Sequence, residues 1–141
     1  MATFNKFLQF TKDLIDGVHD FDGHAFKVML VSSPVPINTN TIKGNLTEIA
    51  AGNGYTAGGL PTTMTTSTST GTAKVTASDV QFTATPGNIG PFQYVVLYND
   101  TPTSPADPLI GWYDYTTQLT ITAGNSFTVD FDGTNGVLTI T

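Results

Sequence analysis

The part of the chain that follows Gly23 consists of short apolar runs separated by glycine, asparagine, proline and threonine-rich segments. Apolar runs bounded by such turn-forming residues are typical of β-strands, because β-branched and aromatic side chains fit a pleated, half-buried surface. Few charges accompany them. The pattern predicts a rigid β-domain that acts through its surface, which favours a structural or adhesive role over catalytic turnover.

The length of the chain suits one domain. At 141 residues it can bury roughly two thirds of the surface that its unfolded form exposes, so it needs neither disulfide nor metal to fold. Cysteine is absent, which excludes disulfide frameworks and thiolate metal sites. We expect a single domain over residues 1–141, with a helix at about 3–17 and a β-domain at about 24–141.

The charge balance narrows the set of partners. The net charge is −6, with five lysines and no arginine, whereas phosphate binding needs clustered cations. We therefore expect neither nucleic-acid nor anionic-membrane binding. The N-terminus lacks the basic start and apolar run of a secretion signal, and the longest apolar runs, residues 28–31 and 94–98, are too short to span a bilayer. Synthesis in the cytoplasm without a signal peptide is expected.

The first element is predicted to be a helix over residues 3–17. Thr3 could cap its start, and Gly17 or the Asp22-Gly23 pair could end it. Its apolar stripe could pack on its own domain, which we favour, or dock a partner subunit. The residues at three- and four-residue spacing are Phe4, Phe7, Leu8, Leu14, Ile15 and Val18.

Strands follow this helix. Residues 92–98 are apolar on both faces and predict a central strand, whereas 80–84 alternate apolar and polar side chains. Residues 62–76 predict a polar hairpin or a mobile edge that breaks at Gly71, and 46–51 one helical turn. Further strands are expected at 25–31, 109–115, 119–121, 127–131 and 137–140. Seven to nine strands with short connections predict an antiparallel β-sandwich or jelly-roll-like barrel.

Two turns carry residue types that can bind a cation. His19, Asp20, Asp22 and His24 lie within six residues, and the segment 130–136 resembles a calcium loop without its closing glutamate. Turns favour Asp and Gly for conformational reasons as well, and that interpretation is preferred at both places. We therefore expect no metal ion and no cofactor.

Catalytic patterns are missing from the sequence. Glu48 is the only glutamate, the aspartates are scattered, and there is no G-x-S-x-G or H-E-x-x-H motif. We expect no enzymatic activity, with a cell-wall or polysaccharide hydrolase as a remote alternative. Trp112, Tyr113 and Tyr115, beside Tyr94 and Tyr98, could form a sugar-stacking or protein-binding patch, but aromatic residues alternating on strands favour a core role.

A resemblance extends along nearly the whole chain. The segments that carry it are MATFNKF (1–7), KVML (27–30), EIAAGNGYTAGG (48–59), IGPF (89–92), VLYND (96–100) and FTVDFDGTNGVL (127–138). Together they resemble a family of small structural proteins of tailed bacteriophages. The resemblance implies a place in the virion and no assigned catalytic residue.

Within that family, the leading expectation is a capsid decoration or cement protein that binds the outside of the head and bridges major capsid subunits. A dimer or trimer would let one unit hold several capsid proteins. A tail or baseplate adhesion protein is the alternative. The candidate contact elements are the N-terminal helix and the glycine-rich loop, although an ordinary surface loop is the preferred interpretation of the latter. The candidate residues are Phe4, Phe7, Gly52, Asn53, Gly54, Tyr55, Gly58 and Gly59.

Overall fold

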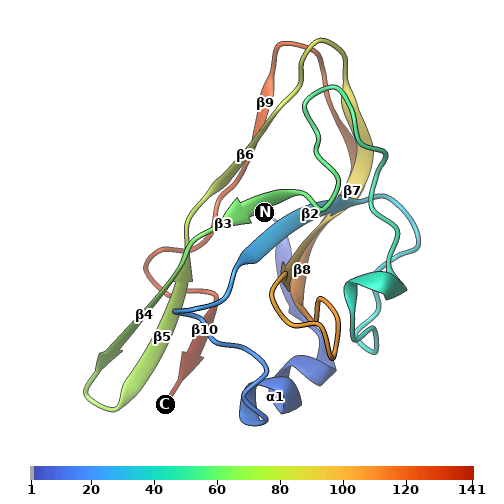
Figure 1. The fold of residues 1–141 in the computed structure, drawn as a ribbon. Coiled ribbons are helices and arrows are strands. Elements are labelled where there is room, and N and C mark those ends of the chain that lie inside the picture. The colour runs from blue at the N-terminus through green and yellow to red at the C-terminus, as the bar shows by residue number, and fades with distance from the viewer. Residues whose placement is uncertain (1) are drawn as a thin grey trace.

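The computed structural model describes residues 2–141 and is mainly β, with one α-helix near the N-terminus (Figure 1). The predicted fold class is therefore confirmed. The elements are β1 (Thr3–Lys6), α1 (Leu8–Ile15), β2 (Phe26–Val31), the 3-10 helix η1 (Lys43–Asn45), β3 (Leu60–Thr62), β4 (Met64–Ser69), β5 (Thr72–Ala77), β6 (Val80–Thr83), β7 (Ile89–Asn99), β8 (Leu109–Ile121), β9 (Ser126–Val129) and β10 (Leu138–Ile140).

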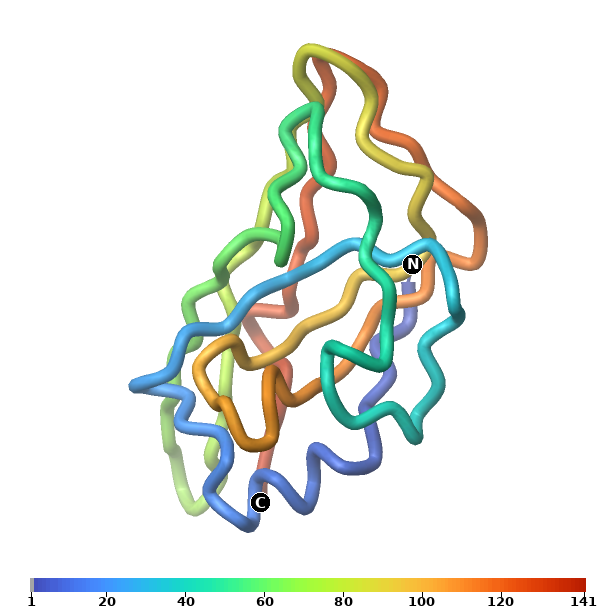
Figure 2. The backbone as a smooth tube through the Cα atoms, turned by 45° about the vertical axis from the view of Figure 1, so that its right-hand side comes forward, coloured from blue at the N-terminus to red at the C-terminus, as the bar shows by residue number. Residues whose placement is uncertain are grey.

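Residues 2–141 form three antiparallel sheets. A five-stranded sheet has the order β1-β8-β7-β2-β3, a three-stranded sheet the order β10-β5-β4, and β6 pairs with β9. The β6–β9 ribbon extends towards one end of the molecule, and α1 lies at the other (Figures 1 and 2). This arrangement is sandwich-like, with the five-stranded sheet as its central layer.

Apolar side chains cover both faces of the five-stranded sheet. Phe26, Val28 and Leu30 of β2 point into a large core shared with the smaller sheets, in which Phe82 and Val129 are fully buried. The opposite face carries a second core. That core consists of Phe7, Met29, Val31, Leu46, Tyr94, Val96, Tyr98, Leu109 and Trp112. Strand β7 contributes to both cores, which confirms the predicted central strand at 92–98.

The predicted start of the helix is wrong. Residues 3–6 form β1, which pairs antiparallel with β8 from Thr3 opposite Asp114 to Lys6 opposite Gly111. The helix begins only at Leu8, with Phe7 rather than Thr3 at its N-cap, and Gly17 follows its end with a φ of +74°. Pairing with β8 satisfies the backbone donors and acceptors on the side of β1 that faces β8, and this outweighs the helical spacing of the apolar side chains.

Three further expectations can be compared with the structure. The helical turn expected at 46–51 is wrong, because the 3-10 helix η1 ends at Asn45 and Glu48 forms an isolated bridge with Val31. The two strands expected at 109–115 and 119–121 are one strand, β8, whose register against β7 shifts between Phe92 and Tyr94. The predicted polar hairpin that breaks at Gly71 is confirmed as β4 and β5.

Candidate functional site

Hydrogen bonds hold the glycine-rich loop at 52–59 against the five-stranded sheet. The Tyr55 hydroxyl donates to Oε2 of Glu48 at 2.8 Å and accepts the backbone N–H of Leu30 at 3.1 Å. The Gly58 N–H donates to the same Oε2 at 2.8 Å, and the Tyr98 hydroxyl donates to the Gly58 carbonyl at 2.7 Å. Burial raises the pKa of Tyr55, so its hydroxyl stays protonated and can donate to the carboxylate. The loop is therefore a structural part of the domain.

This anchoring divides the predicted contact residues into two groups. Phe7, Tyr55, Gly58 and Gly59 are buried within the protein, and no partner can reach them in this conformation. Phe4 is half-buried, and Gly52, Asn53 and Gly54 are exposed. Those four residues remain accessible from outside.

Hydrogen bonds of Asn53 also fix the tip of the glycine-rich loop. The Asn53 side chain donates to the Asn88 carbonyl at 2.9 Å, and the Asn53 carbonyl accepts the Thr85 N–H at 2.9 Å. A Cβ on Gly54 would collide with the Thr83 carbonyl oxygen. The exposed part of the loop therefore lies against the connection from β6 to β7, and its shape is fixed by that contact.

The histidine turn is built around Asn99. The fully buried Asn99 amide lies 3.1 Å from Nδ1 of His19 and 2.9 Å from Nδ1 of His24. Asp20 accepts the backbone N–H of Asp22 and of Gly23, and the Asp22 carboxylate accepts the Thr66 hydroxyl. Across residues 2–141 no group of three or more His, Asp and Glu side chains is arranged to hold a metal ion. These side chains order the turn between α1 and β2.

The burial of His19 makes stability depend on pH. Desolvation lowers the pKa of His19 to about 4, while the Asp13 charge acts in the opposite direction and His24 in the same one. The unfolded chain, with a pKa near 6.5, therefore binds a proton first as the pH falls. The contribution of neutral, buried His19 to the free energy of unfolding is fully present above about pH 7. It falls by about 2 kcal/mol by pH 5, and the remainder is lost towards pH 4.

Urea unfolding of the wild type and His19→Gln at pH 7.5 and pH 5 measures this contribution. The glutamine amide can still bond to Asn99 but does not titrate, so the variant should lose about 2 kcal/mol less than the wild type between the two pH values. An equal pH dependence in both proteins would contradict a neutral, buried His19.

The segment 130–136, whose sequence resembles a calcium loop, forms a turn held by hydrogen bonds to Asp132. Oδ1 of Asp132 accepts the N–H groups of Thr134 and Asn135 at 2.8 Å each, and Oδ2 accepts the Asn135 side chain at 2.7 Å. The backbone bond from Asn135 is the first cause of the lowered pKa of Asp132, followed by the side-chain bond from the same residue. The Asp132 carboxylate therefore stabilises the turn before β10, as the preferred interpretation of the sequence predicted.

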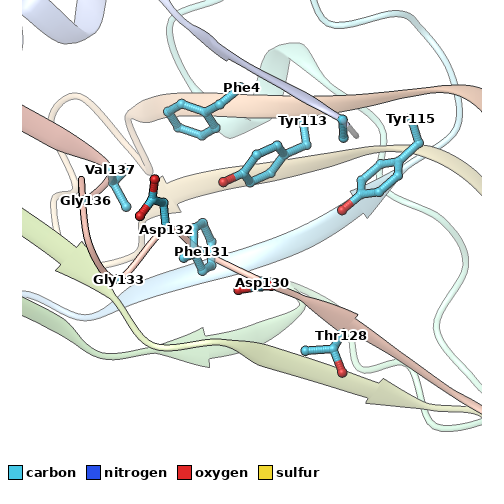
Figure 3. Close-up of a pocket in the computed structure, with 11 residues that line it drawn as sticks. Phe4, Tyr113, Tyr115, Thr128, Asp130, Phe131, Asp132, Gly133, Gly136 and Val137 are labelled. Carbon is cyan, nitrogen blue, oxygen red and sulfur yellow. The ribbon is translucent and has the colours of Figure 1, made fainter.

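A groove of about 700 Å³ lies between β8 and the segment that joins β9 to β10 (Figure 3). Its aromatic residues are Phe4 of β1, Tyr113 and Tyr115 of β8, and Phe131. The Tyr113 ring centroid lies 4.9 Å from that of Phe4, 5.9 Å from that of Phe131 and 6.5 Å from that of Tyr115. Asp130 and Asp132 also line the groove.

Sequence reasoning identified the aromatic residues but did not find the groove. Trp112, Tyr94 and Tyr98 are buried in the second core, as predicted. Tyr113 and Tyr115 point to the other face of the sheet and are only half-buried. The alternation along β8 separates the two sets, but only the fold brings Phe4 and the segment 128–137 beside the tyrosines.

A set of four exposed apolar side chains belongs to α1 and to the loop that follows β2. We call it the end patch and define it by Leu8, Ile15, Val35 and Ile37, whose exposed fractions are 57%, 82%, 57% and 55%. The two helical residues are seven apart and so share one side of α1. The Leu8 N–H donates to the Asn38 carbonyl at 2.9 Å, which joins the helix to the loop that carries Val35 and Ile37.

No protein-family model matches the chain, and no curated protein or solved structure is significantly similar to it. Within the part of the chain that the structure describes, no helix has both the length and the apolar character that crossing a bilayer requires.

Proposed function

We propose that this protein is a structural component of a tailed-bacteriophage particle, and specifically a capsid decoration or cement protein. It binds the outer surface of the head and bridges neighbouring major capsid subunits. The observation that carries the proposal is the end patch, four large apolar side chains that the protein leaves more than half exposed. The resemblance of the sequence to small tailed-phage structural proteins is the reason for placing this contact in a phage particle.

The end patch has the chemistry of a subunit contact. Covering one such side chain completely stabilises an association by roughly 1.5–3 kcal/mol. Leu8 and Ile15 sit on a short helix whose inner side buries Phe10 in the core, so the patch is displayed on a fixed support. A stable contact needs about 800 Å² from each partner, and the patch would form the apolar centre of that area.

The charge of the protein fits the outside of a head. With a net charge of −6 and no arginine, the surface is repelled by packaged DNA and suits the face turned away from it. Self-association into a dimer or trimer would present several end patches at once. All contacts of such a unit must then break together, which raises the effective affinity for the shell.

Cosedimentation with expanded, decoration-free capsids tests the proposal. The wild type should pellet with the capsids, and the double variant Leu8→Ser/Ile15→Ser should bind about 100-fold more weakly, which corresponds to about 3 kcal/mol of lost apolar burial. Both side chains are exposed, so unfolding stability should change by no more than about 0.5 kcal/mol.

Gln81→Ser is the matched control, because it also introduces a serine, on an exposed position of β6 away from α1 (Figure 1). It should bind like the wild type. If the wild type does not pellet with capsids, or pellets only with purified tails, the head placement is wrong. If the double variant binds as tightly as the control, the end patch is not the contact.

A further inference from the structure

We infer that the groove beside Tyr113 is a binding site for a cationic side chain, the guanidinium of an arginine or the ammonium of a lysine, carried by a protein partner. The identity of that partner as another virion subunit rests on the proposed function. The chemistry of the site does not rest on the proposed function, because it follows from the residues that line the groove and can be tested on the isolated protein.

Aromatic side chains line much of the groove. Phe4, Tyr113, Tyr115 and Phe131 present four rings to one hollow, and Tyr113 lies between the other three in the series of ring contacts (Figure 3). The face of an aromatic ring is electronegative and attracts a cation placed within about 6 Å of its centre. Guanidinium groups stack on such faces more readily than ammonium groups do.

Carboxylates lie around the aromatic rings of the groove. Burial raises the pKa of Tyr113 to about 12, and Tyr115 and the carboxylates of Asp130, Asp132 and Asp79 act in the same direction. Asp130 and Asp132 line the groove, so negative charge lies beside its partly desolvated aromatic walls. A partner cation placed there would gain attraction from both the carboxylates and the rings.

Among residues 2–141, the groove carboxylates Asp130 and Asp132 have no ion-pair partner. Within residues 2–141 the ion pairs are Lys12–Asp16 and Lys27–Asp100, neither of which touches the groove. The nearby Lys74 donates its ammonium to the Thr134 carbonyl at 2.9 Å, and its charge helps to lower the pKa of Asp132, but it does not line the groove. Asp130 is exposed and has no hydrogen bond with the described side chains or backbone, so its charge is available to a ligand.

These observations favour a cation over a neutral sugar. A sugar would stack on the tyrosines, and its hydroxyls would donate hydrogen bonds to Asp130, but a neutral sugar would gain no charge–charge attraction from that carboxylate. The volume of about 700 Å³ lies within the range of ligand pockets and can hold a side chain together with part of its backbone. One residue alone should bind in the millimolar range, and neighbouring contacts of the partner would add affinity.

An NMR titration of the isolated, isotopically labelled protein tests the site. The probes are N-acetyl-arginine amide, its neutral isostere N-acetyl-citrulline amide, and methyl glucoside. The arginine probe should give saturable shifts at the amides of Tyr113, Tyr115, Asp130 and Phe131, with citrulline at least about fivefold weaker. Raising the salt concentration should weaken the arginine probe and leave the citrulline probe unchanged.

Asp130→Asn should weaken binding of the arginine probe about fivefold, and Asp16→Asn, which removes an exposed carboxylate at the C-cap of α1, should leave it unchanged. Equal binding of arginine and citrulline, preferential binding of the glucoside, or the absence of saturable shifts would each overturn the inference. A site that binds arginine in protein that fails to pellet with capsids would refute only the proposed function. Capsid binding without a cation site would refute only the inference.

Discussion

Gly59→Ala is expected to destabilise the protein by more than about 4 kcal/mol and to abolish most soluble expression. The φ of Gly59 is +81°, and a Cβ there would collide with the Val28 carbonyl, with the carbonyl carbon at 2.6 Å and Cα of Met29 at 2.8 Å. Val28 and Met29 face the two cores on opposite sides of β2, so the strand cannot move away. Urea unfolding followed by circular dichroism measures the loss.

The variant Gly124→Ala separates the energetic cost of the steric collision from the cost of the left-handed backbone conformation. Gly124 has almost the same φ, +84°, but its Cβ would point into open space. Its cost should be only that of the left-handed conformation, about 1 kcal/mol. If the Gly59 variant is no less stable than the Gly124 variant, the close approach of the glycine-rich loop to β2 is incorrect.

Phe82→Ala should cost about 4 kcal/mol, the usual loss for a large aromatic side chain removed from a packed core. Phe82 is fully buried, its ring centroid lies 5.8 Å from that of Tyr55, and it stands opposite Phe127 in the β6–β9 ribbon. It therefore joins the ribbon, the anchored loop and the main core. Thermal or urea unfolding of the variant measures the effect.

Gln81→Ala provides the comparison on the same strand. Gln81 is exposed, and its truncation should change the free energy of unfolding by no more than about 0.5 kcal/mol. A Phe82→Ala variant that loses less than about 1 kcal/mol would show that the ribbon is not packed on the central sheet.

The strands were predictable where burial is regular along the chain. Alternation identified β6 through Val80 and Phe82, and the run of apolar residues at 92–98 identified β7 as a strand covered on both faces. The N-terminal helix was only half predictable. Phe4 and Phe7 have helical spacing, but Phe4 contacts Tyr113 and Phe7 contacts Trp112 after β1 pairs with β8. Such long-range pairing leaves no local signal in the sequence.

The surface features were less accessible to prediction. The loop at 52–59 was expected to be a contact element, but the only glutamate, Glu48, accepts hydrogen bonds from Tyr55 and Gly58 and draws the loop inwards. A lone glutamate close to a tyrosine among glycines was the available signal. The groove combines residues more than a hundred positions apart, such as Phe4 and Tyr113, and therefore depends on the fold itself.

A reconstruction of the assembled particle at side-chain resolution tests the central claim most directly. We predict copies of the protein on the outer surface of the head, with α1 and the loop carrying Val35 and Ile37 turned towards capsid subunits and Leu8 and Ile15 covered. Copies confined to the tail or to the interior of the shell, or copies on the head with the α1 end facing solvent, would contradict the account.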